Sequence, residues 1–353
     1  MRHRRMYSES EYPKSSRLRM TLFSIYRSDA MPPGSPALKK PNSLVEPLFE
    51  GPIDIVGDVH GEIEALRDLL GHLDYGDDGL HVKGRRLVFV GDLTDRGPDS
   101  PAVIDLVKRF VESGRAQCVL GNHELNLLLC ADTGKRKFDN HWFFGEERSL
   151  DGSDQPTPAV LADDEIRQSA VDFFKTLPLA LQRDDLRVVH ACWDDSMIRI
   201  AREASDAVAL HERYRDLIAV DHELHPELDT VDRRLAHQNR NPVKVLTSGK
   251  ERRVATPFEA SGKLRYEERV PWWDDYGADE PVCVCGHYAI PAAHSLLPPQ
   301  VHCVDYGVAK RWRERQQPDL DGSFELRLAA ARFPERVVIC DNGSSASLFS
   351  EGP

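Results

Sequence analysis

No stretch of this sequence stays apolar for the roughly 18 to 20 residues that a membrane-spanning helix needs. Cysteine is sparse: the seven thiols of this 353-residue chain lack the dense spacing of a disulfide framework, and their odd number fits unpaired thiols. Basic residues are in deficit, with 46 Lys or Arg against 58 Asp or Glu and a net charge of −12. These absences exclude an integral membrane protein, disfavour extended nucleic acid as a partner and predict a cytoplasmic location.

The first 48 residues differ in composition from the rest of the chain. Residues 1–40 contain nine Lys or Arg against three Asp or Glu and show no apolar periodicity. The run Pro32-Pro33-Gly34-Ser35-Pro36 would interrupt any helix or strand placed there. We therefore expect residues 1–48 to form a disordered basic arm. Residues 49–350 are expected to fold as a single domain, with insertions at about 132–165 and 194–240.

From residue 53 onward, short β-rich runs alternate with amphipathic helical patterns. Apolar spacing predicts a helix over residues 62–73, a second over 100–111 with Ser100 as its N-cap, and a third from His123. The expected strands are 53–56, 86–90, 117–120, 186–189, 282–284, 301–306, 324–329 and 337–340. This alternation predicts an α/β fold of stacked β-α-β units.

The first three expected strands each end in a short glycine-containing motif whose side chains can bind metal. The motifs are Gly57-Asp58-Val59-His60-Gly61, Gly91-Asp92-Leu93-Thr94-Asp95-Arg96-Gly97 and Gly121-Asn122-His123-Glu124. Two later strands end in His190 and in Gly286-His287. Because ligand sites form at the carboxyl edge of an α/β sheet, these five strand ends are expected to converge on one pocket.

Any one of these motifs alone would be weak evidence, since Asp, Asn and Gly are common turn residues. Their order, each after an expected strand, indicates a common site. Carboxylate, amide and imidazole ligands suit Mn²⁺, Fe or Zn²⁺ in an open catalytic site rather than a closed structural one. Two ions bridged by a carboxylate clamp the attacking and leaving oxygens at phosphorus and generate hydroxide at neutral pH. We therefore expect two divalent ions, with Mn²⁺ preferred.

In this order the motifs resemble those of the calcineurin-like metallophosphoesterases, specifically the phosphoprotein phosphatase family and its bacterial relatives. The resemblance covers roughly residues 50–345 and is most specific in its first third. It implies a four-layer α-β-β-α sandwich with two mixed central sheets and loop or helical insertions. It also implies the ligands of the two metals, which are Asp58 and His60 for the first, Asp92 as the bridge, and Asn122, His190 and His287 for the second.

The same resemblance implies catalytic roles for the neighbouring residues. His123 would protonate the leaving oxygen and be oriented by Asp95, while Arg96 and Asn122 would bind the phosphoryl group. This agrees with elementary chemistry, because a guanidinium offers a planar fork to phosphate oxygens and an imidazole can transfer protons near neutral pH. A second phosphate-binding arginine is usual in the family. Arg252 is the preferred candidate, and the others are Arg240 and Arg253.

The expected activity is hydrolysis of a phosphorylated substrate, and two substrate classes compete. Asp95 is present in protein phosphatases and usually missing from symmetrical tetraphosphatases, which favours a serine/threonine protein phosphatase-like phosphomonoesterase. The tail from Val304 to Gly307, followed by residues 326–333, favours instead a hydrolase of dinucleoside polyphosphates such as bis(5'-nucleosyl)-tetraphosphate. We take the first as the main interpretation. A noncatalytic binding module is a remote alternative, because every motif position is intact.

Overall fold

The computed structural model describes residues 42–131, 133–135, 140–146, 159–260, 263–290, 297–317 and 323–348. Contacts divide the chain into Met1–Pro36 and Ala37–Pro353, and every described element belongs to the second unit. Most of the predicted basic arm, residues 1–41, therefore lies outside the described residues. That residues 49–350 form a single domain stays a prediction.

The predicted arm ends too late in the sequence. Strand β1, Val45–Pro47, pairs in parallel with β5, Ala180–Gln182, and so belongs to a central sheet. Leu44, Val45 and Leu48 are all buried. Their burial removes apolar surface from water, which explains why this segment joins the fold. The segment is short and follows a basic stretch, so its sequence showed no apolar periodicity.

The first of two central sheets has six strands in the order β13-β12-β11-β2-β3-β4. Strands β2, β3 and β4 run parallel to one another, whereas β11, β12 and β13 are added antiparallel, so the sheet is mixed. Their bounds are β2 Ile53–Val56, β3 Arg86–Phe89, β4 Ala116–Cys118, β11 Ala329–Phe333, β12 Val337–Cys340 and β13 Ser345–Ser347. The strand expected over 324–329 thus begins later than predicted, at Ala329.

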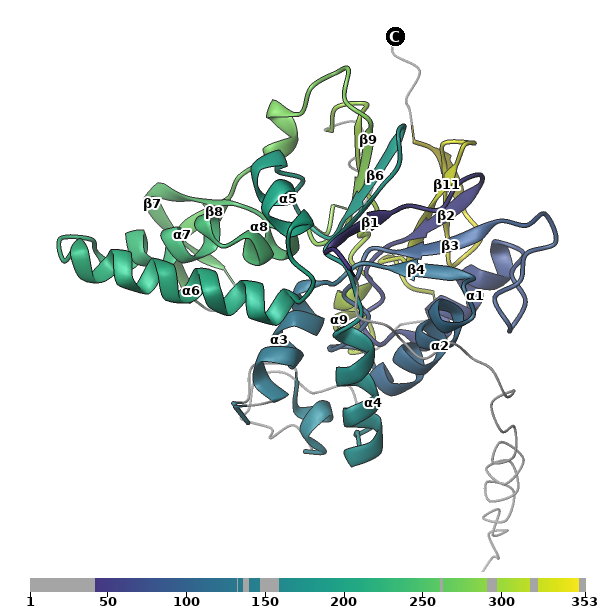
Figure 1. Cartoon of the computed structure of the whole chain (residues 1–353). Coiled ribbons are helices and arrows are strands. Elements are labelled where there is room, and N and C mark those ends of the chain that lie inside the picture. The colour runs from purple at the N-terminus through teal and green to yellow at the C-terminus, as the bar shows by residue number, and fades with distance from the viewer. Residues whose placement is uncertain are drawn as a thin grey trace, which may run out of the picture. The chain divides into compact units, whose positions relative to one another are not determined.

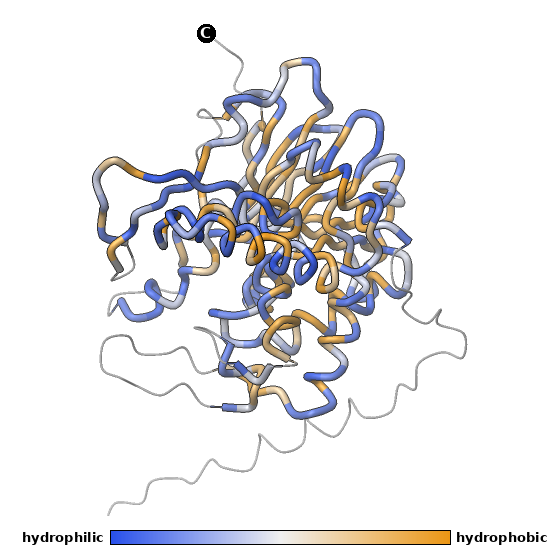
Figure 2. The backbone as a smooth tube through the Cα atoms, turned by 60° about the vertical axis from the view of Figure 1, so that its left-hand side comes forward, coloured by the Kyte–Doolittle hydropathy of each residue, from blue (hydrophilic) through white to orange (hydrophobic). Residues whose placement is uncertain are grey.

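The second sheet has five strands in the order β1-β5-β6-β9-β10 and is also mixed, because only the β5–β6 pair is antiparallel. Its remaining strands are β6 Leu186–Val189, β9 Val282–Cys285 and β10 Val301–Cys303. One buried cluster takes side chains from both sheets, among them Ile55, Val88, Val188 and Val284. Figure 2 shows the hydrophobic residues gathered in this central region. The two sheets therefore share a core.

Helices cover the outer faces of the sheets, with α1 and α2 beside the six-stranded sheet and α5 and α8 beside the five-stranded sheet (Figure 1). The α-helices are α1 Ile63–His72, α2 Ser100–Glu112, α3 Asn122–Ala131, α4 Asp164–Phe174, α5 Asp195–Arg202, α6 Ala207–Leu224, α7 Thr230–Arg240, α8 Pro242–Ser248 and α9 Arg311–Glu314. Short 3₁₀ helices are η1 His141–Phe144, η2 Trp272–Asp275 and η4 Val308–Lys310, and a separate hairpin pairs β7 Glu251–Ala260 with β8 Lys263–Arg269. The predicted α/β fold with mixed central sheets is confirmed.

Two local predictions need correction. Asp99, not Ser100, caps α2, because its carboxylate accepts the Ala102 N–H at 2.9 Å; Ser100 is already helical and accepts the Asp95 N–H instead. The segment expected as a surface insertion at 132–165 is also partly interior. Trp142 and Phe143 in η1 are 1% and 0% exposed, since their rings add to the main core. The seven cysteines are buried thiols.

Among the helices that the structure describes, none is long and apolar enough to cross a membrane. The cytoplasmic location stays a prediction.

A buried charge network ties the six-stranded sheet together away from its loops. Asp54 on β2 is fully buried, and its carboxylate accepts hydrogen bonds from three side chains. Arg85 Nε and Arg332 Nε donate at 2.9 and 2.8 Å, and the Tyr75 hydroxyl donates at 2.8 Å. Arg85 is itself only 6% exposed, and Asp54 is its buried counter-charge, while the half-exposed Glu335 accepts its Nη1–H at 2.8 Å.

Replacing Asp54 by Ala should therefore lower the free energy of unfolding by about 3 kcal/mol, because Arg85 loses its buried counter-charge and keeps only the half-exposed carboxylate of Glu335. Urea denaturation followed by circular dichroism measures the change. Asp105→Ala is the matched control, because Asp105 forms an exposed ion pair with Arg109 one helical turn away and should contribute under about 0.5 kcal/mol. Equal losses in the two variants would contradict the assignment of this network to stability.

Candidate active site

Three strands of the six-stranded sheet and two of the five-stranded sheet lead into the residues predicted from the motifs. In chain order these are Asp58 and His60 after β2, Asp92 after β3, Asn122 and His123 after β4, His190 after β6 and His287 after β9. Hydrogen bonds and close contacts link them into one group that crosses from one sheet to the other. The structure therefore brings all the predicted ligands together.

The backbone at this edge is held in uncommon conformations. Six of the eight described non-glycine residues with positive φ lie in these loops, namely His60, Asp92, Asp95, Arg96, His287 and Ala289. Each such conformation costs about 1 to 3 kcal/mol and persists only where its surroundings fix it, which is typical of functional sites. Gly121 is needed for a related reason, because a Cβ there would collide with Asp92 and Glu124.

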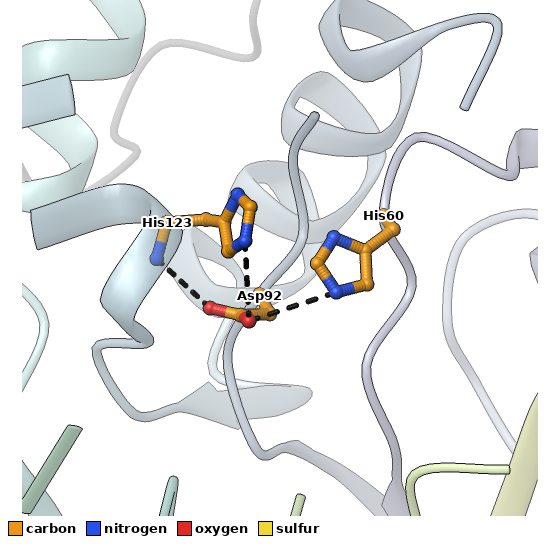
Figure 3. Close-up of side chains that lie close together, drawn as sticks. All are labelled: His60, Asp92 and His123. Atoms are coloured by element: carbon orange, nitrogen blue, oxygen red, sulfur yellow. Dashed lines mark hydrogen bonds and ion pairs between the residues drawn. The ribbon is translucent and has the colours of Figure 1, made fainter. Parts of the chain in front are cut away.

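Asp92 lies at the centre of the group. Figure 3 shows the imidazoles of His60 and His123 beside the Asp92 carboxylate. Its Oδ2 is 3.6 Å from His60 Nε2 and 4.0 Å from His123 Nε2, and its Oδ1 is 3.3 Å from His190 Nε2. The backbone N–H of His123 also donates to Oδ1, at 3.0 Å. Burial acts to raise the pKa of Asp92, but the neighbouring charges of His190 and His123 outweigh it and hold this pKa well below its usual range. The carboxylate is therefore an anion.

Two groups of side chains have donor atoms within 4.8 Å of one another, and Asp92 belongs to both. One group is His60, Asp92 and His123, and the other is Asp92, His190 and His287. Asn122 joins the second group, because its Oδ1 lies 3.2 Å from His190 Nε2 and 2.8 Å from His287 Nδ1. Asp58 adjoins the first, with its Oδ2 3.8 Å from His60 Nε2.

Asp305 is a buried carboxylate that the sequence motifs did not single out. It accepts the backbone N–H groups of Ala289 at 2.7 Å and Gly307 at 2.9 Å, so it fixes the turn that follows His287. Burial, followed by the charges of Asp305 and Asp92, raises the pKa of Asp58 well above its usual range. The sequence placed Asp305 near the end of an expected strand and within the tail from Val304 to Gly307, but gave it no role in the site.

The donor set fits divalent cations. Three carboxylates crowd one buried region, and the raised pKa of Asp58 reflects its burial and then the repulsion of Asp305 and Asp92, both of which a cation would offset. Burial lowers the pKa of His60 well below its usual value, and burial together with the Arg269 charge does the same for His287. Both imidazoles are therefore neutral at pH 7, which is the form that binds metal.

His123 of the first donor group also contacts Asp95 and Arg96. The Nδ1–H of His123 donates to Asp95 Oδ2 at 2.5 Å, and Arg96 Nη2 lies 3.2 Å from His123 Nε2. Burial acts to lower the pKa of His123, but the Asp92 charge and the bond to Asp95 outweigh it and raise this pKa. The raised pKa favours the imidazolium form, and the bond to Asp95 leaves Nε2 facing Arg96 and Asp92.

Glu124 was quoted in the third motif without a role, and the structure gives it one. It is fully buried, and its carboxylate accepts the backbone N–H groups of Asp92 and Leu93 at 2.8 Å each and of Gly121 at 3.1 Å. Burial, followed by the Asp92 charge, raises the pKa of Glu124 to about 7. Glu124 thus ties the loop after β3 to the turn that begins α3.

Two arginines of the β7–β8 hairpin differ in their relation to the site. Arg252 Nε donates to Glu268 Oε1 at 2.7 Å, directly across the hairpin. Arg269 Nη1 donates instead to the carbonyl oxygen of His287 at 3.1 Å. Because side chains alternate between the faces of a strand, the Arg252–Glu268 pair faces away from the side that carries Arg269. Sequence reasoning missed Arg269, since nothing in its local pattern distinguishes it from other arginines of the hairpin.

Comparisons with known proteins agree with this arrangement at the level of the family. The asymmetrical bis(5'-nucleosyl)-tetraphosphatase PrpE of Oceanobacillus iheyensis is 36% identical over 145 residues, which cover 39% of this chain and 54% of that protein. The symmetrical bis(5'-nucleosyl)-tetraphosphatase of Janthinobacterium sp. is 38% identical over 136 residues, 38% of this chain and 42% of that protein. The chain thus spans about half the length of these curated relatives.

A cold-active protein-tyrosine phosphatase of Shewanella is similar over 86% of this chain and 82% of its own, with 14% identity and a TM-score of 0.45. The family described as calcineurin-like phosphoesterase matches residues 51–320. That match covers most of the chain and every strand-end motif. The chain therefore belongs to the calcineurin-like phosphoesterases, a family of phosphoester hydrolases.

Proposed function

We propose that the chain is a two-metal phosphoester hydrolase in which Asp92 is the ligand shared by both ions. The observation that carries this proposal is the pair of donor groups that meet at Asp92. The remaining ligands would be Asp58 and His60 for one ion and Asn122, His190 and His287 for the other. Hydrolysis at phosphorus suits such a pair, because a shared carboxylate holds two cations close enough to act on one phosphate.

When bound, the two ions would neutralise the carboxylates, polarise the phosphate and lower the pKa of the attacking water. In the imidazolium form, which its raised pKa favours, His123 would donate its Nε2 proton to the leaving oxygen, while its Nδ1–H stays on Asp95. Arg96 is exposed and lies beside His123 Nε2, so its guanidinium can hold a phosphate oxygen next to the leaving group. Asn122 could contribute a further contact to the phosphoryl group.

For the substrate we propose a dinucleoside polyphosphate, which was the alternative rather than the main expectation from the sequence. The tetraphosphatase names of the relatives support it. The placement of cations supports it too, because Arg96 adjoins one donor group and Arg269 adjoins the other. An arginine beside each donor group suits a chain of phosphates better than a single phosphomonoester.

A serine/threonine protein phosphatase is the second candidate. The hydrogen bond between Asp95 and His123 favours it, because an aspartate at this motif position is present in protein phosphatases and usually missing from symmetrical tetraphosphatases. Both candidates use the same chemistry at phosphorus, and they differ in what lies beyond the reacting phosphate.

Metal stoichiometry tests the shared ligand. Chelator-stripped protein should take up about two Mn²⁺ per chain, measured by mass spectrometry of the metal. Asp92→Asn should lose both ions, because Asp92 belongs to both donor groups, whereas His60→Ala should lose only one. Asp105→Asn removes a carboxylate on the exposed face of α2 and should keep both ions. Retention of two ions by Asp92→Asn would remove Asp92 from the shared role.

Substrate class is decided by comparing kcat/KM for diadenosine tetraphosphate, a phosphoserine peptide and p-nitrophenyl phosphate in Mn²⁺, with products separated by chromatography. We expect the highest value for diadenosine tetraphosphate, with ATP and AMP as products of asymmetrical cleavage. Two ADP would indicate symmetrical cleavage. A higher value for the phosphopeptide would favour the protein phosphatase, and no turnover by metal-loaded protein would favour the noncatalytic binding module.

The two hairpin arginines provide a matched pair of variants. Arg269→Ala should raise the KM for diadenosine tetraphosphate about tenfold or more, because a hydrogen bond to a charged group contributes about 1.5 to 3 kcal/mol. The KM for p-nitrophenyl phosphate should change less, since that ester carries one phosphate. Arg252→Ala should leave both constants near wild type. A larger effect at Arg252 would restore it as the second phosphate-binding arginine.

A further inference from the structure

Trp142 contacts the candidate acid group from a segment that the sequence placed in a surface insertion. It lies in η1, is 1% exposed, and its indole Nε1–H donates to Asp95 Oδ1 at 2.6 Å. The other oxygen of the same carboxylate, Oδ2, accepts the Nδ1–H of His123 at 2.5 Å. Each oxygen of Asp95 therefore has one nitrogen donor.

We propose that Trp142 is a positioning residue that holds Asp95, and through Asp95 the imidazole of His123, in the orientation for proton transfer to the leaving group. This inference rests on the proposed hydrolase function. A carboxylate with a donor on each oxygen cannot rotate about its Cβ–Cγ bond without breaking one of the two bonds. The indole N–H thus fixes the plane of the carboxylate, and the carboxylate fixes the imidazole ring.

The local backbone makes such a tether necessary. Asp95 has a φ of 71°, as does Arg96, so this loop adopts a conformation that non-glycine residues avoid. The Asp95 N–H donates to Ser100 Oγ at 2.9 Å, which fixes the backbone but leaves the side chain to other partners. Asp95 is 3% exposed, so water has little access to replace a lost donor.

Trp142 is itself held by neighbours beyond the site. Its carbonyl oxygen accepts the N–H groups of Ala162 at 2.9 Å and Gly145 at 3.1 Å. The next residue, Phe143, accepts a bond at its carbonyl oxygen from Arg167 of α4 at 3.1 Å, and its ring packs against the Trp142 ring edge to face. The backbone of η1 is thus fixed to Ala162 before α4 and to α4 itself, so the indole supports Asp95 from outside the strand-end loops.

Trp142→Phe removes the N–H and keeps most of the ring. We expect kcat for phenyl phosphate, whose leaving group needs protonation, to fall about tenfold, a loss typical of an outer partner of a site residue. The kcat for p-nitrophenyl phosphate should fall much less, and KM and metal content should stay near wild type, whereas the melting temperature should fall modestly because Asp95 loses a buried donor. Trp272→Phe is the matched control, because Trp272 is also buried but its Nε1 has no hydrogen-bond partner among the described residues.

A double-mutant cycle separates positioning from packing. In the His123→Ala background, Trp142→Phe should cause no further loss on phenyl phosphate, because both changes act through one proton transfer. Losses that multiply, or equal losses on both esters, would overturn the proposal and leave Trp142 as a packing residue. Failure of the proposed function would look different: wild-type protein loaded with Mn²⁺ would hydrolyse neither ester.

Discussion

The carboxylate of Asp92 is the constraint on which the candidate site depends. It is buried, it is anionic, and it belongs to both groups of donor atoms. A buried carboxylate destabilises a fold unless hydrogen bonds or opposite charges compensate it. The His123 N–H supplies one bond, and imidazoles face both of its oxygens. Two bound cations would offset the remaining cost of burying this negative charge. The charge that destabilises the fold would therefore also create the affinity for metal.

That carboxylate can be placed only if the loop after β3 is fixed, and Glu124 fixes it. The Glu124 carboxylate gathers backbone N–H groups from the Asp92 loop and from Gly121, so the second and third motifs are bound to each other. The second sheet reaches the same point through His190, whose Nδ1–H donates to the carbonyl oxygen of Val90 at 2.7 Å. The two sheets therefore share a site because hydrogen bonds from both end at the loop after β3.

Local patterns were enough to predict most of the strands that lead to the site, although β4 was expected over 117–120 and spans Ala116–Cys118. Expected strands 53–56, 86–90, 186–189, 282–284 and 337–340 agree with β2, β3, β6, β9 and β12 to within one residue. Buried β-rich runs followed by polar turns are encoded in adjacent residues, and the turns meet because three lie at the edge of one sheet and two at the edge of the other. The metal and catalytic roles assigned to their side chains stay predictions, although the structure places those side chains together.

The residues that sequence reasoning missed act across the chain rather than along it. Trp142 meets Asp95 from 47 positions away, Arg269 meets His287 from 18, and β1 gains its place by pairing with β5. From the local sequence alone, a tryptophan between aromatic neighbours is expected to be a core residue, and an arginine in an exposed hairpin is expected to be a solvated surface residue. Only the tertiary fold distinguishes them from others of their kind, because their identity as single residues carries no periodic signal.

Electrostatics gives the proposed site a layered order. The chain carries a net charge of −12, and Asp58, Asp92 and Asp305 are buried together, so a polyphosphate approaching without metal would meet repulsion. Arg96 and Arg269 are exposed, whereas the carboxylates lie inward. Cations bound at the carboxylates would therefore separate protein anions from substrate anions, with the guanidiniums on the solvent side. In this arrangement metal binding and phosphate binding are coupled, because bound cations attract the phosphate anions and bound phosphate stabilises the cations.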